Sequence, residues 1–427
     1  YKRTADALLQ DLLDAFGAVL IEGPKWCGKT TTASQLANSI LRMQDPSMRE
    51  EYLATAKTKP SILLKGDTPR LIDEWQDAPM LWDAVRTTVD DRQIPGQFIL
   101  TGSNAVDKSQ IHHSGAGRIA RLRMLPMSLW ESQESTGEVS LKELFNNPDY
   151  DIDGKMSKMT VEDLIFAASR GGWPASLLAR TPKAQLLVAK NYVQTICSDD
   201  VSGIDGKKRD AKLTSMILRA YARNVSTLVK KKSLLDDVTS SGEVSCHVDT
   251  FDDYVSALEK LFVIQNISAW CPAIRSKTAI RSSVKRCFCD PSIPIALLGL
   301  SPESLSMQLR TFGFIFEQMC IRDLKAYTID LNSHVSYYHD RYDLEADIVL
   351  HLEDGRYALI ECKLGSSEID EGAKHLLELK RLIQEHNKTE KQVPIREPDL
   401  LIVMTGGTMA YSRPDGVKVI PLACLKD

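Results

Sequence analysis

The residues best suited to chemistry lie near the N-terminus, in the run Gly23-Pro24-Lys25-Trp26-Cys27-Gly28-Lys29-Thr30. Its spacing is G-x-x-x-x-G-K-T. Two glycines at these places let backbone N–H groups curl around phosphate oxygens without a Cβ in the way. The lysine then reaches the β- and γ-phosphates, and the threonine hydroxyl binds Mg²⁺. The run therefore predicts a site for a nucleoside triphosphate and magnesium.

Two adjacent carboxylates follow at the end of the apolar stretch PRLIDE (69–74). We expect Asp73 to hold the magnesium shell and Glu74 to polarise an attacking water; the alternative is a solvated acidic loop. A third apolar stretch, QFILTG (97–102), leads into Ser103 and Asn104. A polar side chain here could sense the γ-phosphate, although a plain turn is the alternative.

Arginines follow in the segment HHSGAGRIARLRMLPMSLWE (112–131). Arg118, next to Gly117 in a loop-like position, is the first candidate to reach the γ-phosphate of a neighbouring subunit. Arg121 is the second candidate, and Arg123 is a third. For each of them the alternative is an ordinary surface salt bridge.

A second constellation lies near the C-terminus and consists of Glu317, Asp347, Glu361 and Lys363. The E-x-K spacing puts Glu361 and Lys363 on one face of a strand. Asp347 and Glu361 could then share a divalent cation, with Glu317 completing the oxygen shell and Lys363 acting on the water. Oxygen ligands suit Mg²⁺ or Mn²⁺. The alternative for Lys363 is a surface salt bridge.

The elements that must position these residues can be read from the apolar pattern. AVLIE (18–22) reads as a strand, followed by the glycine loop and a helix, which is the context a phosphate loop needs. Around the C-terminal constellation the order is helix (307–327), further strands including 346–352 and 356–363, helix (371–384) and strand (399–406), which gives α-β-β-β-α-β. Residues ~160–300 read as mostly helical.

The middle zone is locally basic. Residues 207–232 hold nine lysines or arginines against one acid, and 272–290 hold five before Asp290. Three helices followed by a basic two-stranded ribbon predict a winged helix. Its ribbon side chains could meet DNA phosphates, and the alternatives are a solvated basic face, an inter-subunit contact or a protein-binding module. These ribbon side chains are Arg275, Lys277, Arg281, Lys285 and Arg286.

Composition limits the remaining choices. A chain of 427 residues predicts roughly three domains of ~150 residues, and 43% hydrophobic with 26% charged residues is ordinary globular usage. Net charge of −4 excludes a polycation. Nine scattered cysteines without a zinc spacing indicate reduced thiols and a cytoplasmic location. No stretch is long and apolar enough to predict a membrane span.

The sequence resembles one family in five motifs. These are GPKWCGKTTTA, PRLIDEWQ, FILTGS, SGAGRIARLRMLPMSLWE and GGWPA (171–175). The family is that of prokaryotic AAA-type P-loop ATPases with an uncharacterised C-terminal domain of the PD-(D/E)xK nuclease superfamily. The resemblance implies an α/β chain with four parts. They are an AAA-type P-loop ATPase domain (1–135), a helical lid or linker region (136–205), a winged-helix-like domain (206–300) and a PD-(D/E)xK nuclease-like domain (301–427).

Two classes of function follow. The first is an ATP-driven, Mg²⁺-dependent DNA machine that forms a ring-like homo-oligomer, such as a hexamer, binds double-stranded DNA and carries a nuclease or clamping end. The second is an ATP-regulated switch or scaffold that binds protein partners, with a nuclease-like domain that is not catalytic. Both need ATP. The residues expected to contact the nucleotide are Gly23, Pro24, Lys25, Trp26, Cys27, Gly28, Lys29, Thr30, Thr31 and Ser103.

Overall fold

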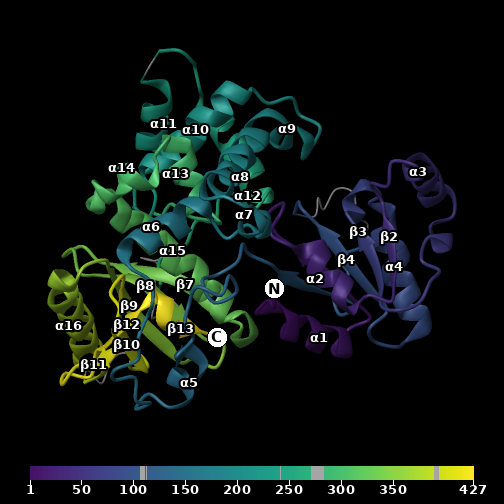
Figure 1. The fold of residues 1–427 in the computed structure, drawn as a ribbon. Coiled ribbons are helices and arrows are strands. Elements are labelled where there is room, and N and C mark those ends of the chain that lie inside the picture. The colour runs from purple at the N-terminus through teal and green to yellow at the C-terminus, as the bar shows by residue number, and fades with distance from the viewer. Residues whose placement is uncertain (106–110, 112, 241, 271–282, 389–393) are drawn as a thin grey trace. The chain divides into compact units, whose positions relative to one another are not determined.

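A computed structural model gives the fold of the chain (Figure 1). It describes residues 1–105, 111, 113–240, 242–270, 283–388 and 394–427. The chain divides into two compact units, one of residues 2–126 with 258–263, and one of residues 127–257 with 264–427 and Tyr1. Each unit has its own sheet and its own hydrophobic core.

The first unit is built on a parallel sheet with the strand order β2-β3-β4-β1-β5. The strands are β1 (Ala18–Glu22), β2 (Ser39–Arg42), β3 (Arg70–Asp73), β4 (Phe98–Gly102) and β5 (Ile119–Arg123). The helices are α1 (Ala5–Ala15), α2 (Lys29–Leu36), α3 (Arg49–Thr58) and α4 (Met80–Arg92). The predicted strand at 18–22 and the predicted helix after the glycine loop are confirmed, and the apolar stretches at 69–74 and 97–102 contain β3 and β4.

Both faces of this sheet are covered. Consecutive residues of β1 and β4 are buried, as is usual where a parallel sheet has helices on each side. Ala18 and Leu20 face one core, in which Trp75 and Trp82 pack with ring centroids 5.0 Å apart. Because the strands are parallel, their C-terminal ends meet at one edge, and β4 places its end between those of β1 and β3.

The second unit begins with a mostly helical part, as predicted. Its elements are β6 (Val139–Ser140), α5 (Leu141–Asn146), α6 (Val161–Arg170), α7 (Pro174–Leu178), α8 (Pro182–Thr195), α9 (Val201–Gly203), α10 (Ala211–Arg223), α11 (Lys231–Thr239), most of α12 (Val248–Lys260), α13 (Ser292–Leu298) and α14 (Pro302–Ser306). After α12, isolated antiparallel bridges join Ile264 to Phe288 and Ile267 to Lys285. The tip of the predicted ribbon, with Arg275, Lys277 and Arg281, lies outside the described residues.

The C-terminal part of this unit is a mixed sheet with the strand order β11-β12-β10-β9-β8-β7. Its elements are α15 (Leu309–Tyr327), β7 (His334–His339), β8 (Glu345–His351), β9 (Tyr357–Lys363), α16 (Ile369–Asn387), β10 (Leu400–Thr405), β11 (Tyr411–Ser412), β12 (Lys418–Pro421) and β13 (Leu425–Lys426). The predicted α-β-β-β-α-β order is confirmed. α16 packs on β8, β9 and β10 through an apolar core.

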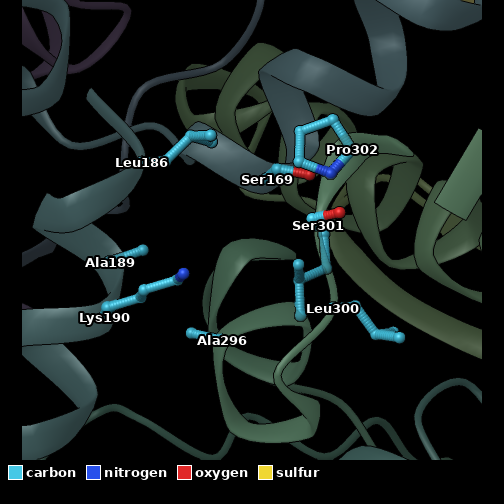
Figure 2. A pocket seen from close by; sticks show the side chains of 9 residues that line it. Ser169, Leu186, Ala189, Lys190, Ala296, Leu300, Ser301 and Pro302 are labelled. Carbon is cyan, nitrogen blue, oxygen red and sulfur yellow. The ribbon is translucent and has the colours of Figure 1, made fainter. Parts of the chain in front are cut away.

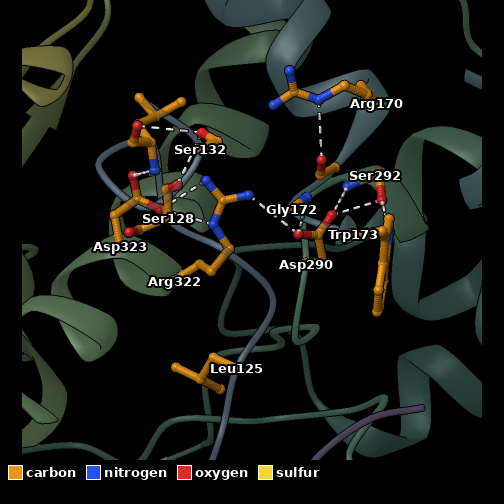
Figure 3. Close-up of polar contacts among 12 residues, drawn as sticks. Leu125, Ser128, Ser132, Arg170, Gly172, Trp173, Asp290, Ser292, Arg322 and Asp323 are labelled. Atoms are coloured by element: carbon orange, nitrogen blue, oxygen red, sulfur yellow. Dashed lines mark hydrogen bonds and ion pairs between the residues drawn. The ribbon is translucent and has the colours of Figure 1, made fainter. Parts of the chain in front are cut away.

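A buried ionic cluster ties distant segments of the second unit together (Figure 3). Asp290, whose side chain is 0% exposed, accepts hydrogen bonds from Gly172 N at 3.0 Å and Ser292 Oγ at 2.6 Å and pairs with Arg322 of α15 at 3.1 Å. Arg322 also pairs with Asp323, which accepts from the backbone N–H of Leu129. The cluster therefore explains the GGWPA turn as structural: its backbone approaches a buried carboxylate.

Two predictions from composition, on the cysteines and on membrane spans, can be compared with the described part of the chain. The eight cysteines within it are all free thiols, which agrees with the reduced state expected from the sequence. Its helices are all too short or too polar to cross a membrane.

Candidate functional site

The glycine run forms a loop between β1 and α2 whose backbone only glycine tolerates easily. Gly23 has φ of 155° and Gly28 has φ of 103°, and a Cβ on Gly23 would lie 2.2 Å from the carbonyl oxygen of Met124. Lys29 begins α2 and is buried, with Nζ donating to the carbonyls of Gly23 at 2.9 Å and Pro24 at 2.8 Å. The ammonium is thus held at the mouth of the loop.

The predicted magnesium ligands are neighbours. The hydroxyl of Thr30 donates to Asp73 Oδ1 at 2.7 Å, joining the start of α2 to the end of β3. Thr101 of β4, which the sequence reading missed, donates to the same oxygen at 2.6 Å. A hydroxyl and a carboxylate so close, at the N-terminus of a helix and beside a buried lysine, are the donor set that Mg²⁺ with phosphate requires. The residues present therefore fit a magnesium-bound triphosphate.

Glu74 and Ser103 also meet at this edge. Glu74 has φ of 55°, which turns its backbone sharply as β3 ends. Its Oε2 accepts from Ser103 Oγ at 3.1 Å and from Nε2 of Gln76. Gln76 Nε2 lies 3.4 Å from Ser103 Oγ as well. Gln76 was not predicted; its contribution depends on the bend after β3, which the sequence pattern does not reveal.

The remaining residues of the loop take different positions. Cys27 is buried, and its carbonyl accepts from Nη1 of Arg3 at 2.7 Å, while Nη2 of Arg3 reaches the carbonyl of Leu125 at 2.7 Å. Trp26 is exposed and has φ of 64°, a rare backbone conformation for a bulky residue. Lys25 is half-buried, and Thr31 is exposed in the first turn of α2. Arg3 is a third contributor that the sequence did not predict, after Thr101 and Gln76.

The first two of the three candidate arginines lie on the surface of the first unit in ion pairs. Arg118 Nε is 2.8 Å from Asp90 Oδ1 on α4, and its side chain is about half exposed. Arg121 Nη1 is 3.4 Å from Glu22 Oε2, at the end of β1 immediately before the loop. Arg123 lies over the ring of Phe262 at 4.7 Å. Arg121 is thus the candidate more closely connected to the loop, because its carboxylate partner directly precedes the first glycine.

The C-terminal constellation is also assembled, with one addition. Carboxylate oxygens of Glu345, Asp347 and Glu361 lie within 4.8 Å of one another. Glu345 was not predicted; it shares a face with Asp347 because residues i and i+2 of a strand point the same way. Asp347 Oδ2 accepts from the backbone N–H of Cys362 at 2.8 Å, which fixes its orientation. Lys363 Nζ is 3.0 Å from Glu361 Oε2, so the two side chains share a face as the spacing required.

Glu361 carries the clearest sign of a missing partner. Its side chain is 0% exposed. The ammonium of Lys363 lies 3.0 Å from Oε2, and within the described residues Oε1 accepts no hydrogen bond. His375 Nδ1, on α16, lies 3.7 Å away and also has no hydrogen bond there. Burial raises the pKa of Glu361 to about 9, with Asp347 adding to the rise. A buried carboxylate oxygen without a donor, close to two further carboxylates, is the condition that a bound cation relieves, so this cluster fits a divalent metal.

Glu317 faces a different partner. Its Oε1 accepts from Nζ of Lys285, which also donates to the backbone carbonyl of Asp347 at 2.9 Å and lies 3.8 Å from Asp347 Oδ1. Burial lowers the pKa of Lys285, but the carboxylates of Glu317 and Asp347 raise it, and the net shift is upward. The structure therefore brings Asp347, Glu361 and Lys363 together and gives Glu317 an ammonium partner.

Two of the ribbon side chains expected at DNA phosphates are not on the surface. Lys285 is 5% exposed and Arg286 is 8% exposed. Arg286 donates to Tyr221 Oη at 3.2 Å and to the carbonyl of Val229 at 3.3 Å. The prediction that these two residues contact DNA is therefore wrong. The local charge pattern suggested that both side chains face solvent. In the structure both are buried, because they donate hydrogen bonds to acceptors far away in the sequence.

Exposed basic side chains instead line a groove between α10 and α11. Its volume is about 610 Å³, and its lining includes Lys212, Arg219 and Arg223. Lys212 pairs with Glu243 and Arg223 with Asp237, each at 2.8 Å. A second hollow, lined by Ser169, Lys190 and Pro302 among others, has a volume of only about 30 Å³ (Figure 2). That is room for a water and not for a ligand.

Comparison with protein families assigns the segments. Residues 15–133 match a family described as AAA domain. Residues 161–304 match "Domain of unknown function (DUF8612)", and residues 312–425 match "Domain of unknown function (DUF4143)". The first match confirms the predicted AAA-type P-loop domain. The third description does not name a nuclease, so the C-terminal part is established only as a mixed-sheet domain.

Relatives with a similar sequence include uncharacterized proteins of Mycobacterium bovis and Mycobacterium tuberculosis. Each is 24% identical over 366 residues, which is 83% of this chain and 72% of the relative. The similarity therefore extends over most of the chain.

Solved structures with some likeness include a Walker-type ATPase of Pyrococcus abyssi, with 12% identity, a TM-score of 0.40, and coverage of 69% of this chain and 94% of that one. A RuvB mutant of Thermotoga maritima has 18% identity, a TM-score of 0.25, and coverage of 61% and 87%. Drosophila ORC bound to DNA has 14% identity, a TM-score of 0.16, and coverage of 71% and 84%. All three TM-scores lie below 0.5, so these likenesses carry no conclusion about this chain.

Proposed function

We propose that this chain binds and hydrolyses ATP with Mg²⁺ at the loop between β1 and α2. One observation carries the proposal: Thr30 Oγ1 and Asp73 Oδ1, from two separate motifs, lie 2.7 Å apart beside the buried Lys29. Motifs that are 43 residues apart meet at the edge where a phosphate loop works. The AAA domain match over residues 15–133 supports the same reading.

Each side chain has a distinct part in the proposed reaction. Lys29 exchanges its carbonyl partners for β- and γ-phosphate oxygens, and the loop amides hold the remaining phosphate charge. Thr30 and Asp73 would hold Mg²⁺, which neutralises phosphate charge when bound. Glu74, positioned by Ser103 and Gln76, orients the attacking water and accepts its proton.

Replacing Glu74 tests this assignment. We expect Glu74→Gln to bind ATP as tightly as the unchanged chain and to lose turnover by about 10²-fold or more, because the amide cannot accept the proton. Phosphate release and nucleotide binding should be measured on the same preparation. An unchanged rate in the variant would remove Glu74 from the mechanism.

We further propose that the C-terminal cluster holds one divalent cation on Glu345, Asp347 and Glu361. The support is the buried carboxylate of Glu361, whose Oε1 has no hydrogen-bond donor among the described residues, close to the carboxylates of Asp347 and Glu345. Cleavage of DNA at this cluster is the finer proposal, in which Lys363 would orient the attacking water. Plasmid should be incubated with Mg²⁺ or Mn²⁺ and either the unchanged chain or Asp347→Ala. Nicking that only the unchanged chain performs supports cleavage, and equal nicking by both argues against it.

We propose that ATP turnover is coupled to binding of double-stranded DNA. The support for DNA binding is the groove between α10 and α11, which Lys212, Arg219 and Arg223 line together with the acidic Asp237 and Glu243. We expect duplex binding to fall steeply with salt, and the slope to drop by about one for each of Lys212, Arg219 and Arg223 changed to glutamine. Lys374→Gln, on the exposed face of α16, is the matched control. Absence of duplex binding at low salt would favour the other candidate function, an ATP-regulated switch or scaffold for protein partners.

A further inference from the structure

The carboxylate cluster contains a cation that comes from another part of the chain. Lys285 belongs to the segment between α12 and α13, inside the match over residues 161–304. The carboxylates belong to α15, β8 and β9, inside the match over residues 312–425. The ammonium and the cluster are therefore supplied by two differently assigned segments of the same compact unit.

Lys285 is held firmly in place. Its backbone exchanges two hydrogen bonds with Ile267, at 2.9 and 3.1 Å. The same ribbon is attached to β7, because Trp270 N donates to the carbonyl of Tyr337 at 2.6 Å and Tyr337 N donates to that of Ser268 at 3.2 Å. The ring of Tyr337 lies 5.6 Å from Nζ of Lys285, so the ammonium is enclosed on that side as well.

This geometry divides the cluster in two. On one side, Lys285 Nζ contacts Glu317 Oε1 and the main chain of Asp347. On the other side, Glu345, Asp347 and Glu361 converge, while Glu317 is outside that group of converging oxygens. Asp347 lies at the division, with Oδ1 3.8 Å from the ammonium. A second divalent ion next to Glu317 would have to share its ligands with a fixed positive charge less than 4 Å away.

We propose that Lys285 is a built-in cation that occupies the Glu317 side of the cluster and so limits the site to a single divalent ion. The inference rests on the proposed metal binding by Glu345, Asp347 and Glu361. The proposal about Lys285 adds that Glu317 is not a metal ligand in the unchanged chain and becomes one when the ammonium is removed. In the unchanged chain the cluster would hold one exchangeable divalent ion and one permanent cation, the ammonium of Lys285.

Counting bound Mn²⁺ by electron paramagnetic resonance, without nucleotide, tests the proposal. Binding that Asp347→Asn retains is background and is subtracted. We expect one Mn²⁺ per unchanged chain, two in Lys285→Met, and one again in the double variant Lys285→Met with Glu317→Gln. Circular dichroism should show that each variant is folded.

The single variant Glu317→Gln keeps the test decisive should Lys285→Met fail to fold. We expect it to bind one Mn²⁺ with an affinity within about threefold of the unchanged chain, because an amide oxygen can still accept from Lys285. Loss of Mn²⁺ binding in Glu317→Gln would overturn the proposal. One Mn²⁺ in both the unchanged chain and Lys285→Met would also overturn it while leaving the metal site in place, and no specific Mn²⁺ in either would remove both.

Discussion

Gln76 is the side chain that connects the two polar groups at the end of β3 and β4. Its amide donates to Glu74 Oε2 and lies 3.4 Å from Ser103 Oγ. Since Glu74 is proposed to orient the attacking water, its carboxylate must be held in a narrow range of positions. Gln76 touches that carboxylate and not the nucleotide site's lysine, which makes it a positioning residue.

We expect Gln76→Ala to lower kcat about tenfold while KM for ATP stays within about twofold, because a shift of the carboxylate slows proton transfer without weakening phosphate contacts. Steady-state phosphate release measures both constants. Gln10→Ala is the matched control, since Gln10 lies exposed on α1 and bonds only locally to Asp14. A KM rise with unchanged kcat would contradict the positioning role.

Residue by residue, the sequence predicts what its local patterns contain. Lys29 and Thr30 belong to one contiguous motif, so that motif alone was enough to predict where they lie. Thr101 and Gln76 could not be predicted, because their roles depend on β4 lying next to β3 and on the bend at Glu74. Lys285 was misjudged because the acceptors that draw it inward are 32 and 62 residues away.

Among the elements, the connections around Asp290 hold the second unit together. The buried Asp290 carboxylate accepts hydrogen bonds from the turn after α6 and from the start of α13, and it forms an ion pair with the buried Arg322 of α15. Removing one member of a buried ion pair leaves the other charge unpaired, which costs about 3–5 kcal/mol. The cluster should therefore limit the stability of the unit in which it lies.

We expect Asp290→Ala to lower the unfolding temperature of that unit by at least about 6 °C, on the scale of about 2 °C per kcal/mol for a large domain. Differential scanning calorimetry is the measurement. Asp252→Ala removes a partner from the surface pair with Lys231, where both side chains are about half exposed, and should change the temperature little. Equal shifts in the two variants would contradict the role assigned to the cluster.

The order of the elements along the chain was more predictable than the contacts between them. Apolar spacing gave the α-β-β-β-α-β order around Asp347 and Glu361, because each element has its own period. It could not show that the ribbon before α13 pairs with β7, since that contact is between segments far apart in sequence. The same limit hid Glu345, which becomes part of a cluster only when β8 and β9 pair.

At the scale of the whole molecule, the surface arginines bear on assembly. Arg118 and Arg121 lie on the surface of the first unit, and a ring-like oligomer would let one of them reach a neighbour's γ-phosphate. We expect Arg118→Ala to bind ATP and to lose turnover by about 10³-fold. Light scattering should show that a non-hydrolysable ATP analogue increases the molecular mass.

Mixing variants separates a role in trans from a role within one subunit. Glu74→Gln and Arg118→Ala are each expected to be inactive alone, yet their mixture should recover part of the turnover, because some interfaces combine an intact Glu74 with an intact Arg118. Arg121→Ala in place of Arg118→Ala tests the second candidate. A mixture that stays inactive with both arginine variants would argue against a catalytic arginine in trans.

The central claim is that the loop from Gly23 to Thr30 binds a magnesium-bound triphosphate, and titration calorimetry tests this claim most directly. With folding confirmed by circular dichroism, the unchanged chain should bind MgATP at one site per chain, and Lys29→Ala should bind at least about 100-fold more weakly, corresponding to about 2.7 kcal/mol. Absence of binding heat from the folded chain across a range of temperatures, or equal affinity in the two proteins, would contradict the account.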